Sequence, residues 1–181
     1  MTKKKAFIIL LLWIILLWFV QIIRINKESA VSETQFNMGE TFEWGGVKIT
    51  PVEAHMYTLQ EYNEAMGTSA ATDGNDDNII CLKLNVVNDT DKDIDWNALF
   101  NNLGYGFETT TWCSSMQPSL EGEINIFYSE MFKSGTSQDI WLATTVERDC
   151  FKKDSWEKVP AMDYSYVLSV YPNPVKIKMT F

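Results

Sequence analysis

Near its start the chain carries an unbroken apolar segment at residues 6–23, with the sequence AFIILLLWIILLWFVQII. Its 18 residues hold no charged side chain and one amide, Gln21. A helix of that length extends roughly 27 Å, which is close to the hydrocarbon thickness of a bilayer. A helix that is apolar on every side either spans a membrane or is buried inside a soluble domain, and the length of this one favours the membrane. The segment therefore predicts a single-pass transmembrane signal-anchor at residues 6–23.

The charges that flank this segment predict its orientation. Lys3–Lys5 immediately precede it, while Arg24 and Lys27 follow it. Positive charge gathers on the cytoplasmic side of membrane helices, so we expect residues 1–5 to form a cytoplasmic tail and the C-terminal domain to be extracellular. A cleaved signal peptide is the alternative. Its apolar region is shorter, however, and ends at a small-x-small site, for which residues 30–32 are the nearest candidate.

Beyond the apolar segment the chain divides into a short polar stretch and a strand-rich region. Residues 24–38 are mixed and polar, which predicts a tether. From residue 39 onward, short segments rich in β-branched and aromatic residues recur between glycine, proline and Asx turns, a pattern typical of strands. We therefore predict an ectodomain at residues 39–181.

The expected elements of this ectodomain are short strands with few helices. Strands are predicted at 41–44, 47–50, 79–87, 104–112, 123–128, 138–147, 164–171 and 174–181. Gly45 and Gly46 suit a two-residue hairpin turn, and Pro51 indicates a bulge or an edge position. Helical turns are predicted at 58–66 and 96–103. The elements predict an all-β fold, a two-sheet antiparallel sandwich of immunoglobulin type, with a small barrel as the alternative.

The net charge argues against one class of partner. The chain has a formal charge of −9, and its three N-terminal lysines lie on the far side of the predicted anchor. Without them, 12 of the 15 basic residues remain against 24 acidic residues. So acidic a surface repels phosphate backbones, which excludes nucleic acid as an expected partner.

Four segments of strand and turn pattern resemble a known family: Met38–Thr41 with Gly46–Thr50, Leu82–Thr90, Lys133–Ser137 and Val175–Met179. Through them the chain resembles the immunoglobulin-like domains of unknown function on membrane-anchored proteins and lipoproteins of Gram-positive bacteria. Some of those domains bear the misleading name of a telomeric repeat-binding factor. The resemblance implies a sandwich on the outer face of the membrane and supplies no established catalytic residues. The chain departs from the lipoproteins, because no cysteine lies near the end of its apolar segment.

The three cysteines allow at most one intramolecular bond. Cys113 and Cys150 both fall at predicted strand ends, so we take this pair as the candidate disulfide of an extracellular domain. Cys81 lies in the middle of a predicted strand and is expected to be a small packed thiol. Three scattered cysteines and one histidine do not make a zinc site, which needs about four ligands at suitable spacing.

An acidic turn resembles part of a calcium loop. Asp89, Asp91, Asp93 and Asp95 alternate along it, but the sixth and twelfth positions lack the glycine and glutamate that an EF-hand requires. A second acidic loop at 73–78 is equally incomplete. A solvated turn between strands is the preferred interpretation, and no metal ligand is predicted.

His55, the single histidine, lies beside Glu53 in a predicted strand. A catalytic histidine needs a nucleophile and an orienting acid, and no G-x-S-x-G elbow occurs. A structural histidine is therefore expected. Most of the tryptophans are expected in the core or at its rim, although an exposed aromatic row would suit carbohydrate or a partner protein.

The sequence offers no catalytic, cofactor-binding or metal-binding set. We therefore expect a non-enzymatic, uncharacterised interaction module that is anchored in the cell membrane and works without a cofactor. The expected partner, besides the membrane itself, is a cell-surface protein or a wall polymer. The alternative is an accessory subunit of a membrane transport or cell-wall complex, in which the anchor helix would also pack against other helices.

Overall fold

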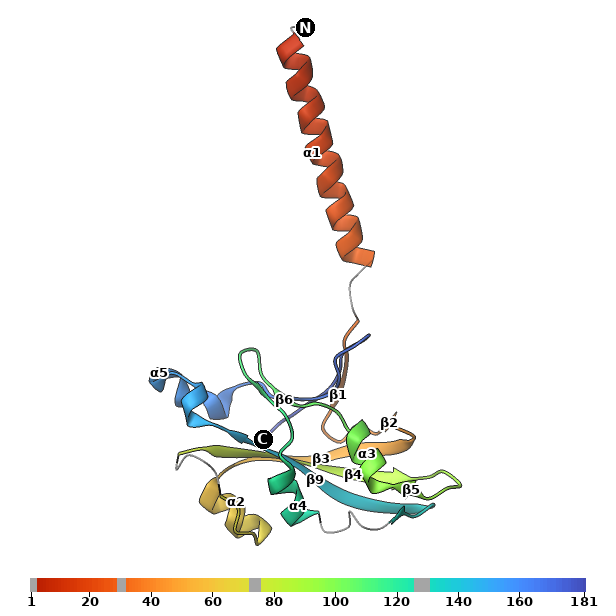
Figure 1. Ribbon diagram of the computed structural model, residues 1–181, viewed down its shortest axis with the longest axis vertical. Helices are drawn as coiled ribbons and strands as arrows, with labels where there is room; N and C mark the ends of the chain where they lie inside the picture. The colour runs from red at the N-terminus through yellow and green to blue at the C-terminus, as the bar shows by residue number, and fades with distance from the viewer. Residues whose placement is uncertain (1–2, 29–31, 72–75, 126–130) are drawn as a thin grey trace. The chain divides into compact units, whose positions relative to one another are not determined.

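The computed structural model describes residues 3–28, 32–71, 76–125 and 131–181 (Figure 1). The chain forms two compact units, Met1–Ser32 and Glu33–Phe181. The second is called the sandwich unit below. Each unit is described by itself.

The first unit is built on one helix, α1 (Lys3–Glu28). The predicted anchor, 6–23, lies inside it, and the helix continues through residues 24–28 because no glycine or proline interrupts this part of the chain. Large apolar side chains are exposed along it from Leu11 to Ile25. Over the parts of the chain that are described, no helix is both long enough and apolar enough to cross a membrane.

The sandwich unit packs two main sheets face to face. One sheet has the order β1 (Thr34–Asn37), β11 (Val175–Lys178), β10 (Ser165–Ser169), β6 (Gly106–Glu108), β7 (Cys113–Ser114). The other has the order β2 (Phe42–Trp44), β3 (Val47–Thr58), β4 (Asn78–Asn88), β9 (Thr136–Val146). A small ribbon pairs β5 (Ile94–Asp95) with β8 (Met131–Phe132). All pairs are antiparallel except β1 with β11, so the predicted antiparallel β-sandwich is confirmed with one parallel exception.

Short helices fill the connections: α2 (Leu59–Met66), α3 (Trp96–Asn102), α4 (Pro118–Ile124), α5 (Lys153–Trp156) and the 3₁₀ turns Arg148–Cys150 and Val159–Ala161. The sequence encodes the start of α2 as a capping box, in which Thr58 accepts from the Glu61 N–H and the Glu61 carboxylate accepts from the Thr58 N–H. Asp95 caps α3 by accepting from two backbone N–H groups, without a reciprocal bond. Both predicted helical turns are therefore confirmed.

The β2–β3 hairpin forms where the sequence predicts it. Gly45 and Gly46 have φ of +59° and +83°, the left-handed values that a type I′ turn requires at both central positions. Further along β3, the pairing register with β4 shifts between Pro51 and Glu53, which confirms the predicted bulge. The proline is accommodated there because a bulge locally interrupts the ladder.

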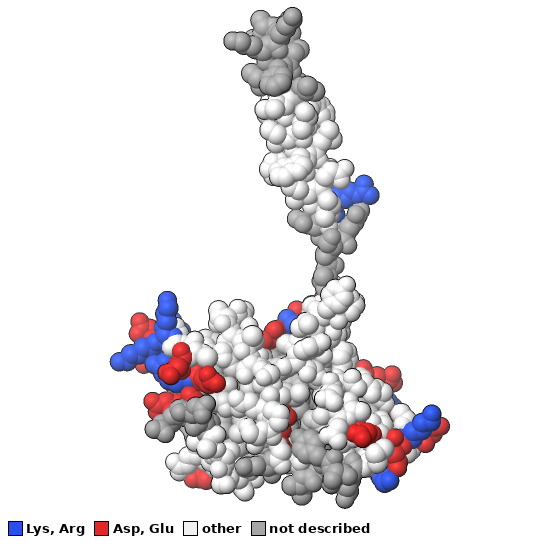
Figure 2. Space-filling model, viewed as in Figure 1, with Lys and Arg blue, Asp and Glu red and all other residues white. Residues whose placement is uncertain are grey.

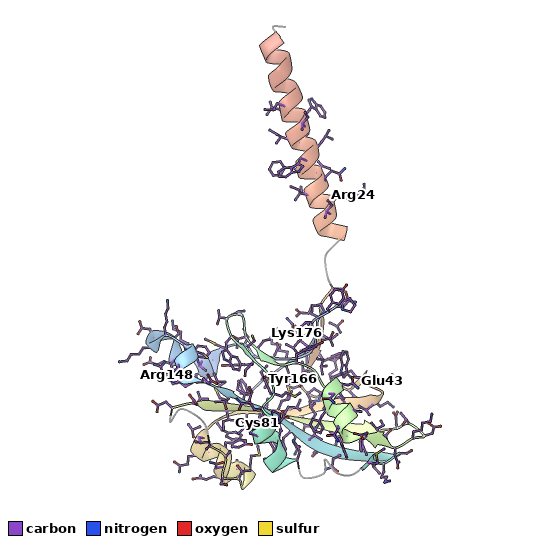
Figure 3. The ribbon with its side chains drawn as sticks, in the orientation of Figure 1. Arg24, Glu43, Cys81, Arg148, Tyr166 and Lys176 are labelled. Atoms are coloured by element: carbon purple, nitrogen blue, oxygen red, sulfur yellow. The ribbon has the colours of Figure 1, made fainter. Side chains whose placement is uncertain are left out.

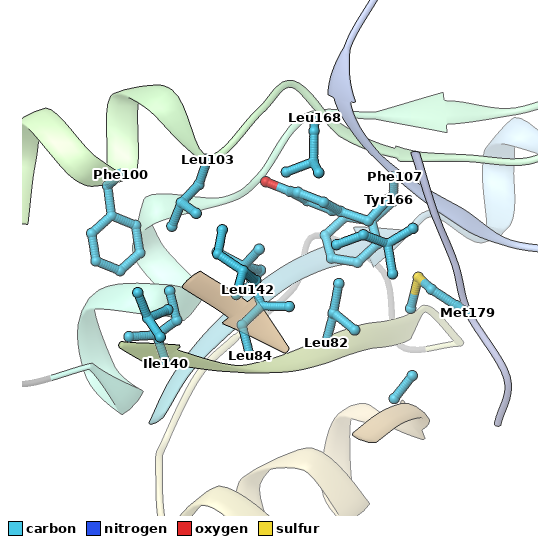
Figure 4. Close-up of a cluster of buried hydrophobic side chains, with 14 of the residues drawn as sticks. Leu82, Leu84, Phe100, Leu103, Phe107, Ile140, Leu142, Tyr166, Leu168 and Met179 are labelled. Carbon is cyan, nitrogen blue, oxygen red and sulfur yellow. The ribbon is translucent and has the colours of Figure 1, made fainter. Parts of the chain in front are cut away.

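The core lies between the two sheets. Leu82 and Leu84 of β4 and Leu142 of β9 pack against Phe107 and Tyr166 from the opposite sheet, and all five are almost completely buried (Figure 4). The strand predicted at 79–87 is thus the central one, paired with β3 on one side and β9 on the other.

A second, smaller cluster covers part of the outer face of the four-stranded sheet. Helices α2 and α4 lie on the side of β3, β4 and β9 turned away from β1 and β6 (Figure 1). Tyr62 of α2 and Leu120 of α4 pack there against Ile79, Cys81 and Ala143. Cys81 is therefore the packed thiol that its position in the strand predicts, and Figure 3 labels it on β4.

Two sequence predictions are corrected by the fold. Residues 34–37, placed in the tether, form β1, because they hydrogen-bond in parallel to Val175–Lys178 at the other end of the chain. Residues 123 and 124, placed in a strand over 123–128, belong to α4, which Pro118 opens at its first turn. Residues 126–128 of that predicted strand lie outside the described residues.

Candidate binding surface

The open part of the outer face of β3, β4 and β9 carries a mixed charged and aromatic surface. We call it the outer-face patch and define it by Glu53, His55, Tyr57, Lys83, Asp139 and Trp141. Side chains at alternate positions of a strand share one face, and the register places Glu53 and Trp141 directly opposite Lys83 on either side. A regular, well-packed sheet thus fixes the spacing of the whole patch.

Lys83 is the centre of an ion network. Its Nζ lies 3.0 Å from Glu53 Oε1 and 3.3 Å from Asp139 Oδ2. The pKa of Glu53 is lowered mainly by its hydrogen bond with His55 and next by its hydrogen bond with Lys83. The pKa of Asp139 is lowered mainly by its hydrogen bond with Asn85 and next by its hydrogen bond with Lys83. The hydrogen bond to Glu53 raises the pKa of Lys83. All three groups are therefore charged at neutral pH, which gives the surface two carboxylates around one ammonium group.

Aromatic rings line the network. The His55 ring stacks on Tyr57 with centroids 5.2 Å apart and lies 6.3 Å from the Trp141 ring. Lys83 Nζ lies 5.4 Å from the centroid of Trp141. Flat ring faces beside fixed charges suit the recognition of a sugar ring or of a protein surface.

His55 and Glu53, which lie near each other in the predicted strand, are brought together in this patch. His55 Nε2 hydrogen-bonds to Glu53 Oε2 at 3.0 Å. Over the described residues, no serine, threonine or cysteine hydroxyl or thiol bonds to His55. The histidine ring is thus part of a polar surface, and its structural role stays a prediction.

The acidic turn is occupied by structural contacts. Asp89 pairs with Lys48 at 2.6 Å, and Asp93 accepts from Lys133 Nζ at 2.8 Å. Asp95 is the cap of α3. Within the described residues, no group of three or more His, Cys, Asp and Glu side chains has a metal-binding arrangement. Part of the second acidic loop, residues 73–75, lies outside the described residues.

The candidate disulfide between Cys113 and Cys150 is not formed. Both thiols are free and exposed, and Cys150 Sγ instead lies 3.7 Å from Glu147 Oε2. Cys113 lies on β7, whereas Cys150 ends the 3₁₀ turn Arg148–Cys150 that follows β9. Sequence position at two strand ends does not determine whether those ends meet in the fold.

Most of the tryptophans are structural, as expected. Trp96 is buried and stacks on Phe132 with ring centroids 4.4 Å apart. Trp44 Nε1 donates to the carbonyl of Asn102 at 2.6 Å, which joins β2 to the end of α3. On the view of Figure 2, charged side chains of the sandwich unit gather near α5 and near β5, and the surface between them is mostly uncharged.

One functional arrangement has no signal in the sequence. Strand β9 is an edge of its sheet, and α4 completes its hydrogen bonds. Asn125 accepts from the Trp141 N–H at 2.8 Å and donates to the Trp141 carbonyl at 2.7 Å. Glu121 accepts from the Ala143 N–H at 3.1 Å. Side chains thus imitate a neighbouring strand and protect the edge from pairing with another chain.

Comparison with solved structures places the chain beside one protein of similar fold. It is an uncharacterised β-sandwich protein from Clostridium difficile 630, which is 14% identical to this chain with a TM-score of 0.54. The similarity covers 83% of this chain and 96% of that protein. At this identity the match supports the β-sandwich fold alone. No curated protein matches the chain.

Comparison with protein families gives a match over most of the chain. The family described as "domain of unknown function (DUF5028)" matches residues 27–174, which include nearly all of the sandwich unit. The protein therefore belongs to the DUF5028 family of uncharacterised domains.

Proposed function

We propose that this protein is a non-enzymatic interaction module, anchored in the cell membrane by residues 6–23, that presents its sandwich outside the cytoplasm. The outer-face patch is the observation that carries the proposal. It combines fixed charges of both signs with three ring faces on a rigid sheet, and its proposed partner is a cell-surface protein or a wall polymer. The resemblance to surface domains of Gram-positive bacteria supports the same setting.

The anchor is supported by the apolar surface of α1. Side chains from Leu11 to Val20 are all exposed, and most are large and apolar. Surface of this kind is unfavourable in water, and a bilayer would cover it. The lysines at residues 3–5 favour a cytoplasmic N-terminus.

The immunoglobulin type is supported by strand order and by one tyrosine. In the order β11-β10-β6, the last strand of the chain lies beside the penultimate one, which lies beside a central one. Strands G, F and C of immunoglobulin domains lie side by side in the same way. Tyr164 precedes β10, and its hydroxyl donates to the Val159 carbonyl at 3.0 Å. This is the hydrogen bond of a tyrosine corner, which in immunoglobulin-type sandwiches precedes strand F.

Photo-cross-linking in intact native cells tests the partner. A photoreactive residue replaces Val52, which is 48% exposed and adjoins Glu53, in the otherwise unchanged full-length protein. We expect it to capture a defined surface protein or wall polymer. The same residue at Tyr171, which is 85% exposed on the β10–β11 turn, should not capture that partner.

Variants distinguish a patch partner from an incidental neighbour. Lys83→Gln should abolish capture of the partner by the photoreactive residue at position 52. Lys48→Gln, which removes an ion pair elsewhere on the same sheet, should preserve that capture. Capture that is unchanged in Lys83→Gln contradicts the patch as the binding surface. Capture of a membrane complex that survives Lys83→Gln but is lost when residues 6–23 become polyleucine would instead identify an accessory subunit of a transport or cell-wall complex.

The two exposed thiols test the topology. After mild reduction of intact cells, a membrane-impermeant maleimide should label Cys113 and Cys150 from outside, because both are exposed. The variant with serine at both positions keeps only the buried Cys81 and should remain unlabelled until it is denatured. Labelling that requires permeabilised cells would contradict the extracytoplasmic placement.

A further inference from the structure

A pocket separate from the outer-face patch opens between α3, α4 and the loop before β6. Its volume is about 560 Å³, within the range of roughly 300–1,000 Å³ typical of small-molecule sites. Phe100, Tyr105, Met116 and Pro118 supply apolar walls, and Glu121 supplies a carboxyl group. The pocket therefore combines mainly apolar walls, with the polar Asn101 and Ser115 among them, and one acidic group.

Glu121 is the unusual member of this pocket. The residue is only 4% exposed, yet it lines the pocket. Its Oε1 accepts from the Ala143 N–H at 3.1 Å, and among the described residues the side-chain carboxyl group makes no further hydrogen bond or ion pair. A carboxyl group has about four acceptor sites, so most of its capacity is unused by the described part of the chain.

Among the described residues that line the pocket, none supplies a positive charge to this carboxyl group. None of the described residues that line the pocket is a lysine, an arginine or a histidine. Burial accordingly raises the pKa of Glu121 to about 7. Buried carboxylates are ordinarily paired with a cation. A ligand that suits this pocket would therefore carry a positive charge.

The walls of the pocket suit an ammonium group and the apolar body attached to it. The Phe100 and Tyr105 side chains bring aromatic rings to the pocket, and ring faces attract ammonium groups as well as apolar surface. The Tyr166 hydroxyl donates to Met116 Sδ at 2.8 Å, which ties the thioether to the core (Figure 3 labels Tyr166). The walls are thus partly fixed by the fold before any ligand enters.

We propose that this pocket binds an organic primary ammonium ion with an apolar body, and that Glu121 is its counter-ion. The ammonium group donates to the Glu121 oxygen left free by Ala143, and the apolar body lies against Phe100, Tyr105 and Met116. Two sources share this chemistry, a free amine and the side chain of a lysine in a peptide. The proposal is independent of the outer-face patch.

Fluorine NMR of a small probe tests the proposal on the full-length protein in lipid nanodiscs. The probe is 4-fluorophenethylamine at pH 8, with 4-fluorophenethyl alcohol as the neutral match. We expect the amine to bind more tightly than the alcohol. Glu121→Gln, which retains an acceptor for Ala143, should weaken amine binding at least about tenfold and leave the alcohol unchanged, since hydrogen bonds to charged groups are the strong ones.

A second variant and a second probe complete the test. Tyr105→Ala alters an exposed wall residue and should weaken amine binding roughly threefold, while Tyr171→Ala, outside the pocket, should not. Nα-trifluoroacetyl-lysine amide distinguishes the two sources of the ammonium group. If this probe binds and the binding depends on Glu121, the ligand is a lysine side chain. If this probe does not bind although 4-fluorophenethylamine does, the ligand is a free amine. Equal affinity of the amine for the wild type and Glu121→Gln, or no binding to either, overturns the proposal.

Discussion

Glu121 Oε1 accepts a hydrogen bond from the backbone N–H of Ala143 at 3.1 Å, so a helix carboxyl group occupies the place of a strand partner on β9. The same residue lines the pocket between α3 and α4. One carboxyl group therefore serves the stability of the sheet edge and sets the polarity of a cavity.

Burial of Glu121 predicts a pH-dependent stability. Its pKa rises from 4.5 to about 7, so between these values the folded protein retains a proton that the unfolded chain releases. The free energy of unfolding should therefore fall as pH rises through that window, by up to about 3 kcal/mol. Glu121→Gln should remove the decline and be the more stable protein at pH 8. Urea unfolding at pH 5, 6, 7 and 8 measures this, and parallel profiles for both proteins would contradict it.

Asn125 predicts the strength of the edge protection. The side chain is buried and bonds both the N–H and the carbonyl of Trp141, so Asn125→Ala leaves two partly buried backbone groups without this partner. We expect a loss of about 3 kcal/mol in the free energy of unfolding, with self-association through the uncovered β9 edge. Asn97→Ala, at an exposed position of α3, is the control, expected within about 0.5 kcal/mol. Denaturant unfolding and light scattering report the two effects, and a monomeric, fully stable Asn125→Ala protein would refute them.

The hydrogen bond from the Tyr164 hydroxyl to the Val159 carbonyl predicts a smaller effect. Tyr164→Phe deletes the donor to the Val159 carbonyl but keeps the buried ring, so the free energy of unfolding should fall by about 1 kcal/mol. Tyr171→Phe, on a ring that is 85% exposed, should change it by less than about 0.5 kcal/mol. Thermal unfolding of the two variants side by side makes the comparison. Equal midpoints would show that this hydrogen bond adds no stability.

The backbone conformation of Gly106 predicts that β6 needs a glycine at this position. Its φ is +139°, and a Cβ atom there would clash with the Ser114 carbonyl oxygen and lie 2.7 Å from Ser115 Cα. Gly106→Ala should therefore separate β6 from β7 and destabilise the protein by about 3 kcal/mol or more. Gly122→Ala on α4 meets no atom within 4 Å and should stabilise the helix by up to about 1 kcal/mol. Unfolding curves of the pair decide between these outcomes, and similar stabilities would rule out the close approach.

Local patterns in the sequence were sufficient for the elements whose cause is local. The glycine pair at 45–46 dictates its turn, Pro51 its bulge, and alternation at 79–87 the central strand, because backbone sterics and side-chain period act within a few residues. The β-sandwich class followed from the number and spacing of such elements.

Tertiary structure alone decided the rest, since those features join distant parts of the chain. Residues 34–37 form a strand only because Val175–Lys178 lies beside them, and Cys113 and Cys150 are free thiols because the fold does not join β7 to the turn after β9 through them. The edge cover on β9 depends on Asn125, whose partners lie 16 residues away. The pocket around Glu121 likewise required α3 and α4 to meet. No local propensity encodes such contacts, because their energy is gained only after the sheets have packed.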